Sequence, residues 1–303
     1  MKTNTLVRVY TKIEANYGGG DAGILFAKAF PAAVAGFLAM NHFAGNIKVK
    51  SKSFTRKRIK GPGTGLGTGK VITNGVDFPE IELSYYLQTA VDPFKADAVG
   101  GTEGSEGTSR VLNIVIPDET EAATTKTYCC FGAQLTSYAI NNTVPEEPVV
   151  TVKFTCYDIS VDPTPIDMSA VAIPTGVINE WDDVVVTVDG DVITELSDYT
   201  LEIKNIFGTA KPGKNSTFDR FIPLLKDKEF DFKIKMSKDS AAILQDTITQ
   251  AVNSFTAIWT EGTNTITVTN CFNDSDDFLE YAGDAIVDQF YTVNLKNGES
   301  VFT

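Results

Sequence analysis

Apolar and polar residues alternate along several stretches of this chain, and a period of two is typical of β-strands with one buried face. The clearest stretch in the first half covers residues 76–87. Its apolar set is Ile81, Leu83, Tyr85 and Leu87, and its polar set is Glu80, Glu82 and Ser84. Residues 229–236 repeat the pattern, with Phe230, Phe232, Ile234 and Met236 against Glu229, Asp231, Lys233 and Lys235. We expect both stretches to lie in sheets whose other face is polar.

The remaining pattern predicts more strands and only two helices. Strands are expected at 5–15, 110–116, 149–157, 265–269 and 290–295, and a hairpin turns at Asp189-Gly190. Asp92 followed by Pro93 indicates one helix start. A second helix is expected after Ser237 or Asp239, because four apolar residues then recur at helical spacing: Ala241, Leu244, Ile248 and Val252. The predicted fold class is mainly β with minor α, with one helix in each half.

One run of signals occurs twice in the same order. Residues 47–60 lead to Gly61-Pro62-Gly63, and residues 199–210 lead to Lys211-Pro212-Gly213. An alternating strand, a helix signal and further strands follow each run. Residues 162–174 contain three prolines and are typical of a linker. We therefore predict two similar domains, at 1–162 and 163–303, and a duplicated β-rich unit favours a symmetric assembly.

Size and charge narrow the possible functions. The 303 residues are enough for two cores, and 43% hydrophobic with 21% charged residues argues against disorder. The net charge of −13 disfavours non-specific nucleic-acid binding by the protein as a whole. The first residues lack a secretory pattern, and the longest uncharged stretch is interrupted by Pro31. These features predict synthesis in a cytoplasm and no membrane insertion.

No set of residues suits catalysis, a cofactor or a metal. The Gly-rich stretch at 18–23 resembles a dinucleotide loop, but Pro31 interrupts the helix that such a loop requires. Residues 61–70 resemble a phosphate loop, but Thr64 stands in place of the first glycine and Val71 replaces the Ser or Thr that would bind magnesium. His42 is the only histidine. We expect the four cysteines to be buried thiols, with Cys129 and Cys130 on opposite faces of one strand. The chain is predicted not to be an enzyme.

A basic stretch is the sharpest charge feature of this acidic chain: Lys48, Lys50, Lys52, Arg56, Lys57, Arg58 and Lys60. We favour contact with an acidic surface on a neighbouring copy, which makes these seven residues candidates for a subunit interface. Two alternatives stay open. The stretch could bind nucleic acid, although Phe54 is its only aromatic residue, or it could be a solvated edge whose lysines prevent aggregation.

The order of elements resembles that of the tail tube proteins of long-tailed bacteriophages and related archaeal viruses, of the type with two tube domains in one chain. Residues 184–190 (Val-Val-Val-Thr-Val-Asp-Gly) and 199–205 (Tyr-Thr-Leu-Glu-Ile-Lys-Asn) are similar to the opening hairpin of such domains. Residues 131–138 and 149–157 resemble the closing strands. The likeness rests on this order and not on a signature motif.

The resemblance implies two β-sandwich or split-barrel domains, each flanked by a helix, and sheets that join into a continuous inner barrel. Three copies would form a pseudo-hexameric ring, and stacked rings would form a hollow tube in the virion tail, assembled in the host cytoplasm. The implied partners are further copies of the chain and the tail terminator, tape measure and baseplate proteins. Viral DNA would pass through the lumen without specific binding.

The polar faces supply the candidates for the lumen of such a tube. They are Glu80, Glu82 and Ser84 in the first half and Glu229, Asp231, Lys233 and Lys235 in the second. A conduit for DNA should carry like charge, although the second set is mixed in sign. Other phage β-proteins, such as a capsid decoration or baseplate-hub protein, fit the same pattern. A cell-surface adhesin or carbohydrate-binding pair of β-sandwiches is the alternative from a different class.

Overall fold

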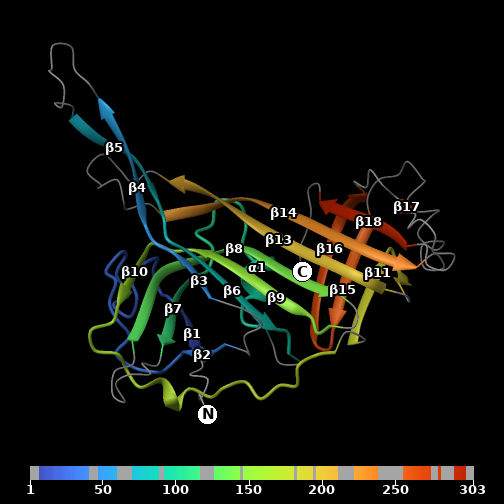
Figure 1. Cartoon of the computed structure of the whole chain (residues 1–303), viewed down its shortest axis with the longest axis horizontal. Coiled ribbons are helices and arrows are strands. Elements are labelled where there is room, and N and C mark those ends of the chain that lie inside the picture. Colours follow the sequence, from blue (N-terminus) through green and yellow to red (C-terminus); the bar gives the residue numbers. More distant parts are fainter. Residues whose placement is uncertain are drawn as a thin grey trace.

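The structure is a computed structural model that describes residues 7–40, 47–59, 70–88, 92–116, 126–143, 146–180, 183–193, 196–210, 222–237, 255–273, 279–280 and 290–297. The chain is mainly β (Figure 1). The strands of the first half are β1 (Arg8–Ile13), β2 (Leu38–Ala39), β3 (Lys48–Lys50), β4 (Ser53–Ile59), β5 (Lys70–Asp77), β6 (Glu80–Tyr86), β7 (Ser109–Ile116), β8 (Lys126–Thr143), β9 (Val149–Thr155) and β10 (Asp158–Val161). Those of the second half are β11 (Val184–Val188), β12 (Asp191–Ile193), β13 (Leu196–Ala210), β14 (Ile222–Ser237), β15 (Phe255–Glu261), β16 (Asn264–Asn273), β17 (Leu279–Glu280) and β18 (Phe290–Asn297).

The two halves have the same strand order. In the first half the neighbours run β2-β1-β7-β8-β9-β6-β3, and in the second half they run β12-β11-β15-β16-β18-β14-β13. The order in which the chain passes through these sheet positions, from the N-terminal to the C-terminal end of each half, is also the same in both halves. The internal repeat that the sequence indicates is therefore present as a repeat of topology.

One antiparallel sheet runs through both halves, because β8 of the first half pairs with β13 of the second. Residues 137–143 of β8 lie opposite residues 198–204 of β13, and we call this pairing the seam. A large core cluster also contains residues of both halves, among them Leu83 and Phe232. The division into domains at 162/163 stays a prediction.

Strand β8 pairs with four other strands because it is long and bent. It spans 18 residues and pairs with β7 and then β13 along one edge, and with β10 and then β9 along the other. Gly132 has a φ of +63°, and a Cβ there would lie 2.8 Å from the Cβ of Tyr157. Only glycine fits this bend without strain.

The predicted strand faces are confirmed where side chains are described. Ile81, Leu83 and Tyr85 of β6 are buried, as are Phe232 and Ile234 of β14, whereas the intervening residues are exposed or half-buried. The predicted hairpin is β11–β12, and Asp189 and Gly190 both have positive φ, as its two-residue turn requires.

Helix is scarce in the described structure. Asp92 accepts a hydrogen bond from the Phe94 amide, but helix α1 (Lys95–Val99) has only five residues, and a 3₁₀ turn covers Met168–Ala170. The predicted helix after Ser237 lies outside the described residues. A pair of flanking helices is thus not shown.

The predicted linker is packed against the first half. Asp162 donates its amide hydrogen bond to the Thr127 carbonyl, and Met168 is buried in a second core cluster with Tyr10 and Phe131. This segment runs along the lower side of the molecule in Figure 1 and reaches β11.

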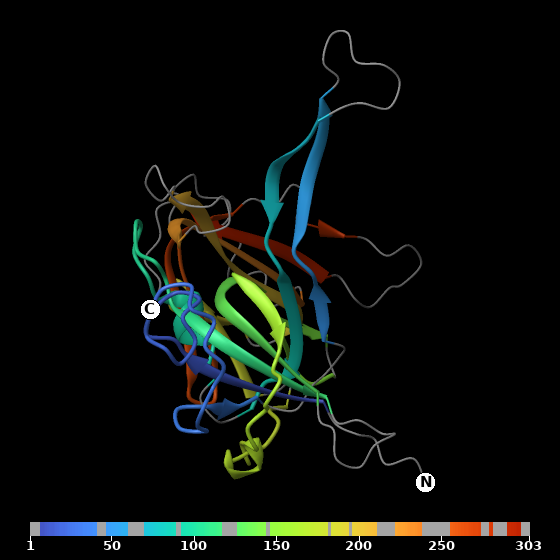
Figure 2. The same ribbon diagram turned by 90° about the vertical axis from the view of Figure 1, so that its left-hand side faces the viewer.

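Strands β4 and β5 form a separate two-stranded sheet that extends away from the rest of the molecule (Figures 1 and 2). This projecting hairpin continues the pairing of β3 with β6. It corresponds to the far end of the β13–β14 hairpin in the second half.

Candidate assembly surface

A continuous polar face follows from the strand registers. One row across neighbouring strands reads Lys48, Glu82, Lys153, Ser137, Lys204 and Glu229, on β3, β6, β9, β8, β13 and β14. The next row on β6, β9, β8, β13 and β14 reads Ser84, Thr151, Ala139, Glu202 and Asp231. Lys233 and Lys235 continue the same face of β14. All seven lumen candidates therefore lie on one face of one sheet.

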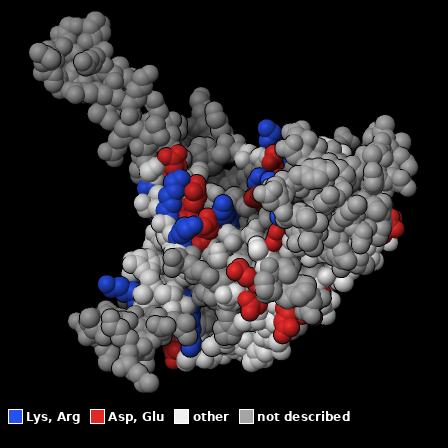
Figure 3. All heavy atoms as spheres, turned by 45° about the vertical axis from the view of Figure 1, so that its right-hand side comes forward, with Lys and Arg blue, Asp and Glu red and all other residues white. Residues whose placement is uncertain are grey.

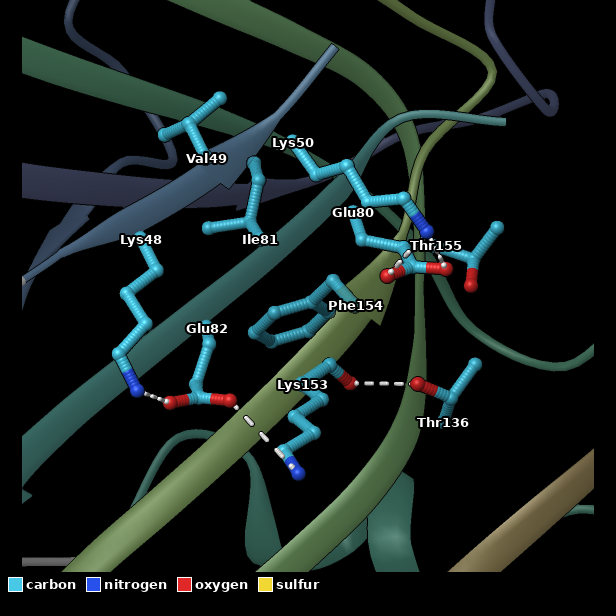
Figure 4. Close-up of a pocket in the computed structure, with 10 residues that line it drawn as sticks. All are labelled: Lys48, Val49, Lys50, Glu80, Ile81, Glu82, Thr136, Lys153, Phe154 and Thr155. Carbon is cyan, nitrogen blue, oxygen red and sulfur yellow. Dashed lines mark hydrogen bonds and ion pairs between the residues drawn. The ribbon is translucent and has the colours of Figure 1, made fainter. Parts of the chain in front are cut away.

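A groove of about 570 Å³ lies on this face beside β3 (Figure 4). Two of the basic interface candidates and two of the acidic lumen candidates line it together. Lys48 Nζ lies 2.5 Å from Glu82 Oε1, and Lys50 Nζ lies 3.2 Å from Glu80 Oε1. Lys153 Nζ approaches the other oxygen of Glu82 at 3.6 Å. Two members of each predicted set are thus partners of one another within one chain.

Glu82 stays charged in this arrangement. The hydrogen bond from Lys48, and the positive charges of Lys48 and Lys153, hold the pKa of the Glu82 carboxyl below its usual range. Because these side chains are solvent-exposed, the pairs contribute little to stability, and their effect is to neutralise the surface locally.

A hydrogen bond crosses the seam, and opposite charges meet beyond it on β13 and β14. Ser137 Oγ donates to Glu202 Oε1 at 2.9 Å, which links β8 to β13. Lys204 Nζ lies 3.4 Å from Glu202 Oε2, and Lys235 Nζ lies 3.9 Å from Asp198 Oδ2. The polar face is therefore continuous from one half to the other.

The signs on the polar face are nearly balanced. Its cations on these strands are Lys48, Lys50, Lys153, Lys204, Lys233 and Lys235, and its anions are Glu80, Glu82, Asp198, Glu202, Asp227, Glu229 and Asp231. Figure 3 shows basic and acidic side chains directly beside one another on this side of the molecule. The uniform negative charge expected of a DNA conduit is not what this face presents.

The other basic residues occupy different places. Lys52 Nζ lies over the rings of Phe78 and Tyr157, at 5.9 and 5.6 Å. Arg56, Lys57 and Arg58 belong to β4 of the projecting hairpin. Lys60 lies outside the described residues. The basic stretch is thus divided between the polar face and the projecting hairpin.

The edge of β3 is open where the matching edge of β13 is paired. Within the described residues, β3 pairs with β6 alone, whereas β13 pairs with both β14 and β8. Val49 lies opposite Ile81 and so faces the core side, yet its side chain is 50% exposed. An open edge beside an exposed valine can accept a further strand.

Sequence reasoning left several charged residues of this face out of the lumen candidates, among them Lys153, Glu202 and Lys204. The signal was present, because Lys153 alternates with apolar residues in 149–157 and the other two do so in 199–205. The joining of these stretches through β8 could not be read from local periodicity.

The described residues contain no cluster of His, Cys, Asp or Glu that could hold a metal ion. All four cysteines are buried, as predicted, and Cys129 and Cys130 lie in different core clusters on opposite faces of β8. Burial raises the pKa of the Cys271 thiol to about 11, so it is protonated at neutral pH. Across the described ranges, no helix has the length and apolar character needed to span a bilayer.

No protein-family model matches the chain, and no curated protein is significantly similar to it.

Proposed function

We propose that this protein is a structural virion protein, the tail tube subunit of a long-tailed bacteriophage or related virus. Its copies form rings that stack into a hollow conduit for viral DNA. The observation that carries the proposal is the repeat of one strand order in two halves that share a sheet through the seam.

The seam is a template for the contact between copies. In the second half, β16 and β17 both pair with β18, just as β8 pairs with β9 in the first half. Strand β8 of the first half therefore corresponds to β16 and β17 taken together in the second half. The part of β8 that pairs with β13 corresponds to β17. The strand that corresponds to β13 is β3, whose outer edge is open. We infer that β17 of one copy pairs with β3 of the next.

This contact joins two different edges, so it propagates in one direction and closes into a ring. Each chain supplies two similar units, and three chains give six units around an axis. Closure removes the open edges and covers Val49. A sandwich or split-barrel form for each unit is part of this proposal.

The polar face then lines the lumen. Its cations are matched by anions, so a polyanion passing through meets few unpaired positive charges that could retain it. The projecting hairpin, with Lys57 and Arg58 in β4, reaches the next ring. Its basic residues meet an acidic surface of the neighbouring copy.

Negative-stain electron microscopy of the purified protein at high concentration tests the proposal. Rings or tubes with an axial channel are expected. Monomers that persist at the highest concentration would contradict it.

A further inference from the structure

The two halves also meet through a set of buried polar side chains on the core side of the sheet. We call these the junction cluster: Gln88, Asn142, Asn179, Tyr199, Trp259 and Glu261. Every one is at least 95% buried, and within the described residues each has a side-chain nitrogen or oxygen without a hydrogen-bond partner. Such a concentration of unpartnered groups is unusual in a protein core.

Glu261 is the critical member. It ends β15, its side chain is 0% exposed, and neither carboxylate oxygen has a hydrogen-bond partner of normal geometry among the described residues. Burial, together with the negative charges of Asp183 and Asp92, raises the pKa of this carboxyl to about 8. The nearby Asn179 side chain lowers this pKa and so opposes the rise, although burial outweighs it.

The groups that face Glu261 come from both halves and from the segment between them. Asp92 and Tyr138 belong to the first half, Asn179 and Asp183 follow the linker, and Tyr199 belongs to β13. Two tyrosines and the Phe94 amide already donate hydrogen bonds to Asp92. Lys95 of α1 donates to the Thr265 carbonyl on β16 and does not neutralise Glu261.

We propose that the Glu261 carboxyl is a proton-dependent latch between the two halves of the chain. While it is protonated, the junction cluster stays closed. When it loses its proton, an unpaired charge appears in the core beside Asp92 and Asp183, and water enters the cluster to solvate it. The junction cluster between the two halves is therefore closed at neutral pH and opens to water in mildly alkaline solution.

Trp259 provides the readout, because it belongs to the same cluster and is one of only two tryptophans. In the full-length protein with Trp181→Phe, Trp259 is the sole tryptophan. Its fluorescence should shift to longer wavelength as pH rises from 6 to 10, with a midpoint near 8. Adding Glu261→Gln should abolish the transition, whereas Glu202→Gln, on the polar face, should leave it intact.

A second variant covers the case in which Glu261→Gln does not fold. Asp183→Asn removes a negative charge near Glu261 and should move the midpoint to lower pH. A transition that persists in Glu261→Gln, or a midpoint unchanged by Asp183→Asn, would overturn the proposal. A midpoint that moves by more than about one pH unit when calcium chloride is added would also overturn it, because it would place a cation in the cluster.

Discussion

Val49 on β3 and Ile203 on β13 face the core side from the first strands of two related hairpins, but they are 50% and 1% exposed. The difference arises because β8 pairs with β13, whereas no strand of the described structure covers the outer edge of β3. Strand β13 is therefore paired along both edges, whereas the corresponding strand β3 is paired along one edge within the described residues. In the proposed assembly, a neighbouring copy adds its strand to the other edge of β3.

Replacing Val49 with Asp should prevent ring formation while leaving the monomer folded. A charge at this position would be buried without a partner once the next copy docks, but it is solvated in the monomer. Sedimentation velocity measures assembly, and circular dichroism checks the fold. The matched control is Val185→Asp, a 44% exposed valine of β11, which should assemble normally. If the two variants assemble equally well, β3 does not lie in the interface between copies.

Reversing the charges of Lys57, Arg58 and Lys60 to Glu should impair polymerisation without unfolding the monomer. The expected cause is repulsion from the acidic surface of the next copy. Filament length, measured by electron microscopy, should fall. Reversal of Lys12, which pairs with Asp21 away from the hairpin, serves as the control. Unchanged filaments in the triple variant would show that the basic residues are not at the interface.

Truncating Phe232 to Ala should cost about 3–5 kcal/mol of unfolding free energy. The ring is fully buried on β14 and packs edge-on against Tyr199, with centroids 6.3 Å apart. Urea denaturation measures the loss. Phe272→Ala, at a partly exposed phenylalanine of β16, should cost far less.

Changing Arg110 to Met should cost about 3–5 kcal/mol, because Asp97 would remain buried without its partner. The guanidinium Nε lies 2.5 Å from Asp97 Oδ2, and both side chains are almost fully buried. The double variant with Asp97→Leu should recover part of the loss. Lys50→Met, which breaks the exposed pair with Glu80, should change the free energy of unfolding by less than about 1 kcal/mol.

The stability of the chain should fall between pH 5 and pH 7 because of Glu261. Its pKa is about 8 in the folded protein and near the ordinary value of 4.5 when unfolded. The folded state therefore holds this proton more tightly over this interval, so the stability contributed by Glu261 is greatest below pH 4.5 and decreases as pH rises towards 8. The slope from this group is about 1.4 kcal/mol per pH unit. Glu261→Gln should remove that slope in urea titrations at several pH values, and Glu202→Gln should not.

Period-two alternation was sufficient to place β6, β9 and β14 and to assign their buried faces. It also identified the β11–β12 hairpin, since Asp189-Gly190 suits a positive φ at both positions. The helix start expected at Asp92-Pro93 lies two residues later, with Phe94 before Lys95, and the buried Asp92 accepts hydrogen bonds from Tyr85, from Tyr138 and from the Phe94 amide.

The pairing of Lys48 with Glu82 could not be predicted, because it depends on the register between β3 and β6. The same holds for the junction cluster, whose members come from five separate stretches of the chain. Local sequence determines which face a residue takes on its strand. It does not determine which distant strand lies alongside.

The pairing of β8 with β13 has a mechanical consequence. It is the ladder that joins the two halves, so a force that pulls the halves apart along the strand must shear all the hydrogen bonds of the seam at once. Antiparallel ladders loaded in this way resist much larger forces than ladders opened one bond at a time. The chain is thereby stiff along one axis, as a load-bearing element would need to be.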